Sequence, residues 1–210
     1  SMLERKQVPL SSLPLKKSLV RMNEQIERLT RLISEMLDLS RIEDNRLSLK
    51  KQILNLNELV DTVILDLNIL KKVPIHLHQE TEFEVIADKD RIEQVIINLV
   101  TNAIKYSSES EEVELRIFET EDHMAAVSVT DHGIGIPEKD QKEIFKRFYR
   151  VSGKDENTYA GLGIGLFLVH EIIERHGGRL QLESKIGAGS TFTFVLPYES
   201  KLNKGSASKG

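Results

Sequence analysis

The sequence has 210 residues, 40% of them hydrophobic and 30% charged, which suits one globular domain with an additional segment. Its net charge of −4, with both signs interspersed, gives no basic surface, so no nucleic-acid partner is expected. The lack of cysteine excludes disulfides and thiolate metal sites and suits a cytoplasmic location. No apolar run reaches the ~18 residues of a membrane span, so no membrane contact by this sequence is expected.

The N-terminal part predicts a loop followed by a long helix. Residues 7–15 contain two prolines and two serines and are expected to form the loop. A helix is expected over residues 16–43, because apolar residues recur there in alternating steps of four and three, as in a bundle seam. The seam consists of Met22, Ile26, Leu29, Ile33 and Met36. Since a lone helix with this apolar surface needs a partner, we expect a homodimer through residues 16–43.

After residue 45, short strands and helices mix without strict β-α-β alternation. A helix whose N-cap is Asn57 or a neighbour is expected to end before Pro74. Other helices are expected over 88–106 and 163–176. Strands are expected over 49–54, 75–77, 113–117, 127–129, 180–182 and 192–196. This order predicts an α+β fold, with helices on one face of a mostly antiparallel sheet. Residues 201–210 are predicted to be disordered.

The helix that begins after Asp88 carries an unusual polar stripe. On a helical wheel of about 100° per residue, Asn98, Asn102 and Lys105 cluster beside the apolar face. Two asparagines at a helix–loop contact, satisfied by backbone groups, would explain the pair equally well. The functional interpretation is a stripe that faces a metal-bound polyphosphate, because an amide oxygen can ligate Mg²⁺ and a lysine supplies positive charge.

Two glycine clusters follow this helix. Asp131 ends an expected strand and precedes Gly133 and Gly135, so its carboxylate could accept a hydrogen bond from an exocyclic amine such as that of adenine. An ordinary Asp/Gly turn is the alternative. The second cluster, residues 161–166, opens a helix, where free backbone N–H groups favour phosphate. It is neither a dinucleotide fingerprint nor a Walker loop.

The stretch between the two glycine clusters is polar and predicts a mobile lid over about residues 138–160. Phe145 and Phe148 are ordinary core anchors when taken alone, but here they are expected to pin one end of the lid. Arg147 and Arg150 would then be placed to reach a γ-phosphate.

Taken in order, these motifs resemble the Bergerat-type ATP-binding domain, and within it the sensor histidine kinases of two-component systems. The ordered set is Asn-x-x-x-Asn-x-x-Lys-Tyr, Asp-x-Gly-x-Gly, Phe-x-x-Phe, Gly-x-Gly-x-Gly and Gly-Ser-Thr-Phe, and the resemblance covers residues 16–198. It implies a two-layer α/β sandwich preceded by a long bundle helix, with ATP and Mg²⁺ as ligands. The implied domains are a truncated dimerisation and histidine-phosphotransfer region over 1–45, an ATP-binding catalytic domain over 46–200 and a tail over 201–210.

The resemblance also assigns roles to individual residues. The resemblance implies that Asn102 is the Mg²⁺ ligand. It also implies that the catalytic residues are Asn98, Lys105 and Arg150, and that Arg150 approaches the γ-phosphate. Asp131 resembles the adenine-reading carboxylate, flanked by Gly133 and Gly135. Further residues expected to line the nucleotide are Asn98, Lys105, Tyr106, Ile136, Phe148, Tyr149, Gly161, Leu162, Gly163, Ile164, Gly165, Leu166 and Thr191.

The implied activity is transfer of the ATP γ-phosphoryl group to a histidine, followed by relay to a response-regulator receiver domain. The expected acceptor motif, a bundle histidine followed by an acidic residue, is absent from this sequence, so no autophosphorylation is expected. The six histidines are read as structural or surface residues: His76, His78, His123, His132, His170 and His176. The acceptor is expected on a histidine-bearing helix of a parent protein, either free or anchored in a bacterial inner membrane.

Three alternatives stay open. An ATP-hydrolysing clamp of the gyrase or HSP90 kind would place a glutamate where this sequence has Asn98, and an amide cannot accept a proton. A Bergerat-fold serine kinase of the anti-sigma-factor type would lack the long helix before Asn45. A nucleotide-gated dimerisation module would not need the set of Asn102, Lys105 and Arg150.

Overall fold

The computed structural model describes residues 13–44, 46–70, 74–107, 112–151 and 162–198. The chain divides into two compact units, Ser1–Arg46 and Leu47–Gly210. Each unit is described by itself below.

Over its described residues, the first unit consists of one long helix, α1 (Leu13–Glu43). The helix starts earlier than expected, so the predicted loop over 7–15 is wrong at its end: Pro14 lies in the first helical turn, where a missing N–H has no helical partner to lose. The seam side chains are all more than half exposed: Met22 (61%), Ile26 (61%), Leu29 (59%), Ile33 (51%) and Met36 (51%). The apolar stripe of α1 is therefore an open surface.

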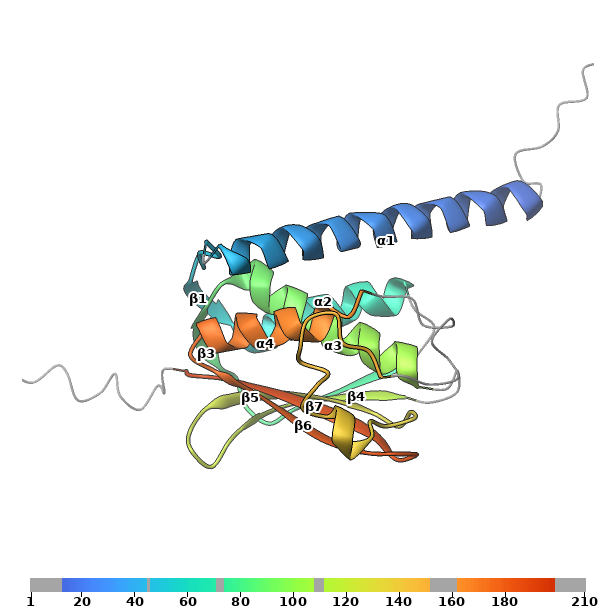
Figure 1. Cartoon of the computed structure of the whole chain (residues 1–210). Helices are drawn as coiled ribbons and strands as arrows, with labels where there is room; N and C mark the ends of the chain where they lie inside the picture. The colour runs from blue at the N-terminus through green and yellow to red at the C-terminus, as the bar shows by residue number, and fades with distance from the viewer. Residues whose placement is uncertain (1–12, 45, 71–73, 108–111, 152–161, 199–210) are drawn as a thin grey trace, which may run out of the picture. The chain divides into compact units, whose positions relative to one another are not determined.

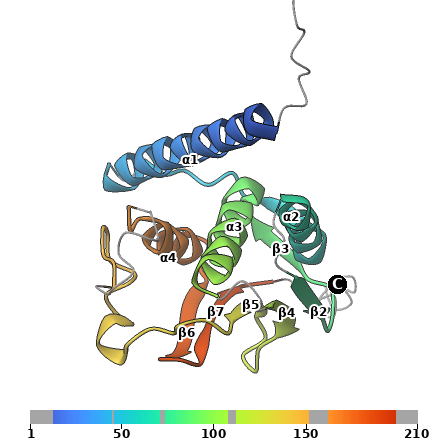
Figure 2. The same ribbon diagram turned by 90° about the vertical axis from the view of Figure 1, so that its right-hand side faces the viewer.

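The second unit is a two-layer sandwich of helices on a sheet. The five-stranded sheet has the order β2-β4-β5-β7-β6. The strands are β2 (Ile75–Gln79), β4 (Val113–Glu119), β5 (Ala125–Asp131), β6 (Arg179–Lys185) and β7 (Gly189–Leu196). Helices α2 (Leu56–Leu70), α3 (Lys89–Tyr106) and α4 (Gly165–Arg175) lie along one face of it (Figures 1 and 2). The predicted fold class is confirmed.

Strand pairing contains two features that the sequence pattern did not reveal. β2 pairs with β4 in parallel, whereas the other neighbours in the sheet are antiparallel. A separate antiparallel pair joins β1 (Gln52–Asn55) to β3 (Glu84–Ala87). β3 was not predicted, since only two of its four residues are buried and it is held by tertiary pairing, including a bridge from Val85 to Tyr198.

The core lies between the three helices and the inner face of the sheet. Alternate residues of β5, including Val127 and Val129, pack toward buried side chains of α3 such as Ile96 and Leu99. Every one of these four side chains is at most 1% exposed. Each buried aliphatic side chain contributes about 1.5–3 kcal/mol through the hydrophobic effect, so this layer fixes α3 on the sheet.

Polar caps set the start of two helices. Asp88 caps α3, and its carboxylate accepts a hydrogen bond from the Arg91 N–H, as predicted. For α2 the cap is Asn55, whose side-chain oxygen accepts from the N–H groups of residues 57 and 58. Asn57 is buried instead and accepts from the Phe83 N–H while its amide donates to the Thr81 carbonyl, which ties α2 to the segment before β3.

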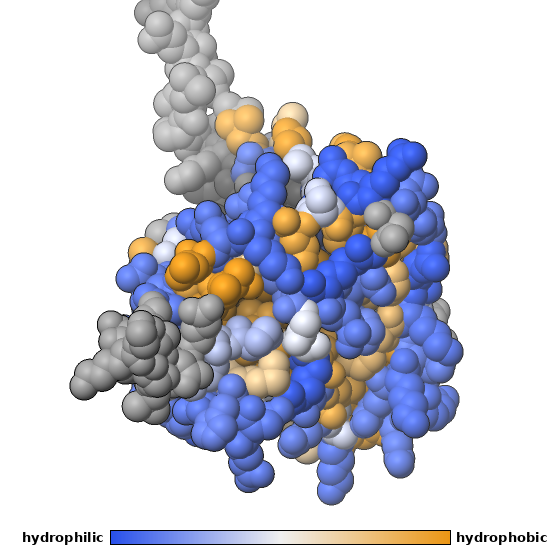
Figure 3. All heavy atoms as spheres, turned by 90° about the vertical axis from the view of Figure 1, so that its left-hand side faces the viewer, coloured by the Kyte–Doolittle hydropathy of each residue, from blue (hydrophilic) through white to orange (hydrophobic). Residues whose placement is uncertain are grey.

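The end of the molecule with β1 and β3 has a mostly hydrophilic surface with small apolar patches (Figure 3). Ile53 and Ile86 are cross-strand partners there and are 70% and 47% exposed. In the described part of the chain, no helix has the length and apolar composition needed to span a bilayer.

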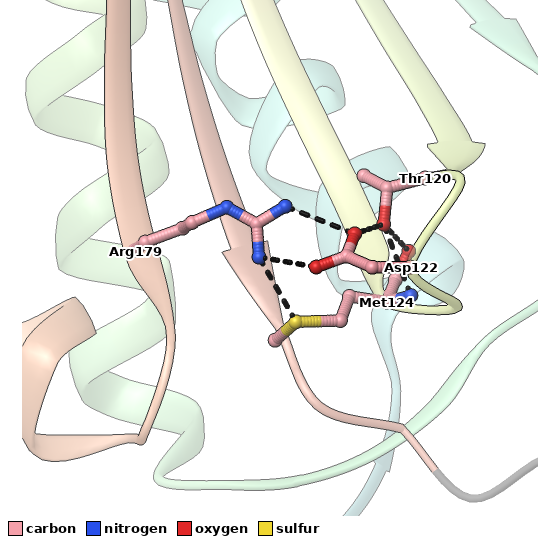
Figure 4. A network of polar contacts seen from close by, with 4 residues as sticks. All are labelled: Thr120, Asp122, Met124 and Arg179. Atoms are coloured by element: carbon pink, nitrogen blue, oxygen red, sulfur yellow. Dashed lines mark hydrogen bonds and ion pairs between the residues drawn. The ribbon is translucent and has the colours of Figure 1, made fainter.

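A charged network closes the β4–β5 hairpin onto β6 (Figure 4). Both terminal nitrogens of Arg179 donate to the Asp122 carboxylate, at 2.8 and 3.0 Å, and the Thr120 hydroxyl donates to the same group at 2.6 Å. These hydrogen bonds, that of Arg179 first, lower the pKa of Asp122 to about 2. Asp122 is therefore ionised at neutral pH and fixes the turn.

Candidate functional site

One face of α3 carries the predicted polar stripe. Asn98, Asn102 and Lys105 are half-buried, next to a fully buried apolar face. That buried face consists of Ile92, Val95, Ile96, Leu99, Val100 and Ala103. Lys105 Nζ lies 3.1 Å from the Tyr106 hydroxyl and 4.7 Å from the centre of its ring. The stripe thus borders the core and turns two amides and a cation toward one side of the helix.

The N-terminus of α4 lies against this stripe. A Cβ atom on Gly165 would stand 3.3 Å from Asn98 Oδ1, so the glycine allows the amide oxygen to approach the first turn of α4. The N-cap residue Ile164 makes no side-chain cap, and the first turn contains no acidic residue. The helix dipole and the first N–H groups therefore favour an anion beside Asn98.

A hard cation fits next to such an anion. Among the described residues, no three His, Cys, Asp or Glu side chains gather to hold a metal ion by themselves. The amide oxygens of Asn98 and Asn102 are the oxygen ligands that the stripe offers, and Mg²⁺ usually takes few protein ligands and several from phosphates and water. The donor set fits Mg²⁺ carried by a polyphosphate rather than a protein cage.

Asp131 occupies the end of β5, on the inner face of the sheet. It is 5% exposed, and its Oδ1 accepts a hydrogen bond of 2.9 Å from the Gly133 N–H, which orients the carboxylate. A Cβ atom on Gly133 would lie 2.0 Å from the Tyr106 carbonyl oxygen. Only glycine allows this contact, and it brings the Asp131 loop against the end of α3.

The same loop is fixed on its other side by the β6–β7 hairpin. Gly135 has φ +67°, and a Cβ atom there would lie 2.0 Å from the Lys185 carbonyl oxygen. The Ile136 N–H donates to Ser184 Oγ at 2.8 Å, and the Gln141 amide donates to the carbonyls of Ile136 and Ser184. The loop after Asp131 is thus anchored to both α3 and β6.

The segments on either side of residues 152–161 meet. The Phe148 N–H donates to the Gly163 carbonyl at 2.9 Å, and both residues have positive φ, +62° and +71°. The Tyr149 hydroxyl donates to the buried Asp140 carboxylate at 2.6 Å, which raises the pKa of Tyr149 to about 12. Tyr149 therefore stays a protonated donor. The rest of the predicted lid, residues 152–160, and Gly161 lie outside the described residues.

Several predicted positions differ in how they face the site. Ile164 is fully buried, so only its backbone is available, whereas Arg150 is exposed. Thr191 pairs across strands with Thr130, and their hydroxyls lie 3.0 Å apart on the outer face of the sheet. Ser190 is the cross-strand partner of Asp131 and is 6% exposed. By strand alternation Ser190, rather than Thr191, shares the inner face with Asp131.

The sequence contained a signal that Ser190 shares a face with Asp131. Phe192 and Phe194 recur with a two-residue period in the predicted last strand, and Ser190 has the same parity as both, so extending that period toward the N-terminus places Ser190 on the same face. Gln141 and Ser184 carried no such signal, because their hydrogen bonds join segments that are far apart in the chain.

A hollow of about 330 Å³ lies at the strand ends, and Asp131 and Ser190 are among the residues that line it. Its lining comes from β5, β6, β7 and the turns that follow β5 and β6. None of the lining residues belongs to α3 or α4, so this hollow is not the region between the polar stripe and the N-terminus of α4.

Comparison with known proteins places the sequence of this region in a protein family. The family described as "Histidine kinase-, DNA gyrase B-, and HSP90-like ATPase" matches residues 87–200. This range contains the polar stripe of α3, Asp131 and its loop, and the N-terminus of α4.

Individual relatives are sensor kinases. The chain is 33% identical to the sensor histidine kinase WalK of Bacillus subtilis over 179 residues, which is 83% of this chain and 29% of that protein. It is 36% identical to the circadian input-output histidine kinase CikA of Synechococcus elongatus over 180 residues, 81% of this chain and 23% of that protein. The chain therefore spans less than a third of the length of these curated relatives.

Among solved structures, the Acinetobacter baumannii histidine kinase AdeS is similar with a TM-score of 0.68 and 26% identity. The similarity covers 90% of this chain and 86% of that one.

Proposed function

Since the chain belongs to the family of histidine kinase-, DNA gyrase B- and HSP90-like ATPases, we propose that it is the ATP-binding catalytic part of a sensor histidine kinase. The observation that carries the proposal is the close approach of the Asn98 amide to Gly165, where a Cβ atom would stand 3.3 Å from Asn98 Oδ1, because it brings a polar helix face to a helix N-terminus without a side-chain cap. Asp131 stands at the other end of the same region, buried and oriented by Gly133.

ATP would lie with its base at Asp131 and its phosphates between α3 and the N-terminus of α4. Asp131 accepts a hydrogen bond from the adenine amino group, and Gly133 and Gly135 let the backbone lie close to the base. The N–H groups at Gly163 and Gly165 face the phosphates. Asn102, supported by Asn98, supplies amide oxygen to Mg²⁺, and Lys105 adds positive charge beside Tyr106.

The proposed reaction transfers the γ-phosphoryl group to a histidine nitrogen. A bond forms between that nitrogen and the γ-phosphorus while the bond to the β–γ bridging oxygen breaks, and ADP leaves. Bound Mg²⁺ neutralises charge on the phosphate oxygens, and the chain's own residues mainly position the groups. Arg150, exposed beside the lid anchors, is proposed to approach the γ-phosphate during transfer.

A hydrolytic role is less well supported. At the helix position where an ATP-hydrolysing clamp needs a carboxylate to activate water, this chain has the amide of Asn98, which cannot take a proton. We therefore propose that water is a poor acceptor and histidine the intended one.

The proposed partners follow from α1 and from the acceptor. The exposed seam of α1 suits a second copy of the chain, because alternating four- and three-residue steps match the packing of paired helices. No histidine occurs in α1, so the acceptor is proposed on another helix of the parent bundle. A response-regulator receiver domain would take the phosphoryl group next, in the cytoplasm.

Calorimetry of nucleotide binding tests the proposal. Asp131→Asn exchanges a charged acceptor for a neutral amide and should weaken ATP by about 1.5–3 kcal/mol. Asn102→Ala should weaken Mg·ATP far more than Mg-free ATP. Thr101→Val is a matched control on α3, because its hydroxyl bonds only within the helix, to the carbonyls of residues 97 and 98. Undiminished ATP affinity in both Asp131→Asn and Asn102→Ala would refute the proposed site.

A further inference from the structure

One side-chain hydrogen bond ties the end of the segment over residues 138–150 back to its start. The Tyr149 hydroxyl donates to Asp140 Oδ1 at 2.6 Å, and Asp140 is the last residue of the short 3-10 helix η1 (Glu138–Asp140). The bond joins residues nine positions apart in the chain, and the aspartate that accepts it is only 7% exposed. A short hydrogen bond to a buried carboxylate is a strong constraint on the residue that donates it.

The Asp140 end of this bond is fixed to the sheet. The next residue, Gln141, donates its side-chain amide to the carbonyls of Ile136 and Ser184, at 3.1 and 2.9 Å, and Ser184 belongs to β6. The Ile144 N–H donates to the Asp140 carbonyl at 3.0 Å, and the Ile144 side chain is buried in the core. Asp140 is therefore a rigid anchor, held by contacts that do not involve its own carboxylate.

The Tyr149 end lies against the residues that lead into α4. Phe148 has φ +62°, a left-handed conformation that is unfavourable for a residue other than glycine, and its N–H donates to the Gly163 carbonyl at 2.9 Å. A Cβ atom on Gly163 would lie 2.7 Å from the Tyr149 carbonyl oxygen. Such a backbone conformation persists only where the surrounding structure enforces it. The bond from Tyr149 to Asp140 and the bond from Phe148 to Gly163 are two constraints that do so.

Arg150 follows Tyr149 directly, and its side chain is exposed. Its proposed contact with the γ-phosphate is made during transfer, so the backbone that carries it has to be in place beforehand. A misplacement of about 1 Å can cost about a hundredfold in rate. Because Tyr149 is held at its hydroxyl by Asp140 and at its backbone by Gly163, the direction in which the chain enters Arg150 depends on Asp140.

We propose that Asp140 is a positioning residue for phosphoryl transfer, which acts through the Tyr149 hydroxyl to hold Arg150 in reach of the γ-phosphate. This inference rests on the proposed function. Asp140 itself contacts neither ATP nor the acceptor histidine and exchanges no proton in the reaction. Its removal therefore slows the transfer step and leaves ATP affinity nearly unchanged.

The test measures two quantities for each variant. Calorimetry gives the dissociation constant of Mg·ATP, and the second quantity is the rate of transfer from labelled ATP, at saturating concentration, to a separately supplied histidine-bearing bundle of the parent. Tyr149→Phe removes only the hydroxyl and keeps the ring, which packs against the core. We expect the rate to fall about tenfold, the value of one hydrogen bond expressed in the transition state, and the dissociation constant to change less than about twofold.

Variants of the anchor and a control complete the series, with thermal unfolding as a check on folding. Asp140→Ala should reproduce the loss seen in Tyr149→Phe, whereas Asp140→Asn retains an acceptor oxygen and should keep most of the rate. Lys146→Met is the control, because it breaks an exposed ion pair with Glu143 in the same segment and should leave the rate unchanged.

A double variant distinguishes positioning of Arg150 from a general structural effect. Adding Tyr149→Phe to Arg150→Ala should lower the rate no further, because the hydroxyl then has no arginine to hold in place. An unchanged rate in Tyr149→Phe, additive losses in the double variant, or a loss of ATP affinity as large as the loss of rate would overturn the inference and leave the proposed function standing. If the unmodified chain binds ATP but transfers no label to the bundle, the proposed function itself fails.

Discussion

His176 links the two helices that frame the site, and its protonation should weaken the fold. The side chain is 3% exposed; its Nδ1 donates to the Ile172 carbonyl at 2.7 Å, and its Nε2 accepts the Asp88 N–H at 3.0 Å. Asp88 caps α3 and also accepts from the Lys50 N–H at 2.7 Å. A neutral imidazole therefore joins the C-terminus of α4 to the N-terminus of α3.

The pH dependence follows from the direction of the pKa shift. Burial lowers the pKa of His176 and outweighs the opposing effect of the hydrogen bond to the Ile172 carbonyl; the smaller effects of Lys51 and Asp88 lower and raise it, respectively. Because the folded pKa lies below the unfolded value of about 6.5, the unfolded chain binds the proton first as pH falls. The stabilisation is complete above about pH 6.5 and is lost as pH falls through the folded pKa.

The size of the loss follows from the hydrogen bond. Protonated Nε2 would face the buried Asp88 N–H, donor against donor, and an unsatisfied buried donor costs about 1–3 kcal/mol. We therefore expect the free energy of unfolding to fall by about this amount between pH 8 and pH 5 through this group.

Urea unfolding followed by circular dichroism at several pH values measures this. His176→Gln retains an acceptor near the position of Nε2 but does not titrate, so its stability should vary less with pH than that of the unmodified chain. His78→Gln removes an exposed histidine of β2 and serves as the control. An unchanged pH dependence in His176→Gln, or stability that rises on acidification in the unmodified chain, would refute the reasoning.

Two further predictions concern the loop after Asp131 and the seam of α1. Gly135→Ala would place a Cβ atom 2.0 Å from the Lys185 carbonyl oxygen and should lower ATP affinity at least tenfold in calorimetry. The control is Gly187→Ala, where φ is +74° but nothing lies within 4 Å of the added Cβ atom, so it should cost only about 1–2 kcal/mol of stability. Equal ATP affinities in the two variants would contradict this account. The double variant Ile26→Glu, Ile33→Glu should shift the chain toward monomer in sedimentation equilibrium, because both side chains are more than half exposed on the seam. Ser34→Glu, at an exposed position, is the control and should cause no such shift. An unchanged mass in the double variant would rule out the seam as the dimer contact.

Much of the second unit could be predicted because its elements carry strong local signals. The period of α3, its Asp88 cap and the alternation of β4 and β5 all depend on residues close together in the chain. The features that the sequence did not predict depend on tertiary contacts. β3 has only four residues and an exposed Ile86, and the parallel pairing of β2 with β4 joins residues nearly 40 positions apart.

The candidate site shows the same division. The stripe of Asn98, Asn102 and Lys105 could be drawn from helical geometry alone, because spacing fixes which side chains share a face. The network around Ser184 could not, since its partners Ile136 and Gln141 lie more than 40 residues away. Ser190 is an intermediate case: the two-residue period of the strand places it on the face of Asp131, whereas the motif predicted Thr191 as the residue near the nucleotide.

Transfer of phosphate to a supplied histidine tests the central claim most directly. The chain is incubated with ATP labelled at the γ-phosphate, alone and with a complete two-helix bundle of the parent that carries its histidine. We expect no label on the chain alone and acid-labile, base-stable label on the added bundle, at low efficiency because the substrate is not tethered. Asn102→Ala should abolish the transfer, and Arg150→Ala should reduce it more than it reduces ATP binding. Acid-labile label on the chain alone, or no transfer to the bundle despite confirmed ATP binding, would contradict the account.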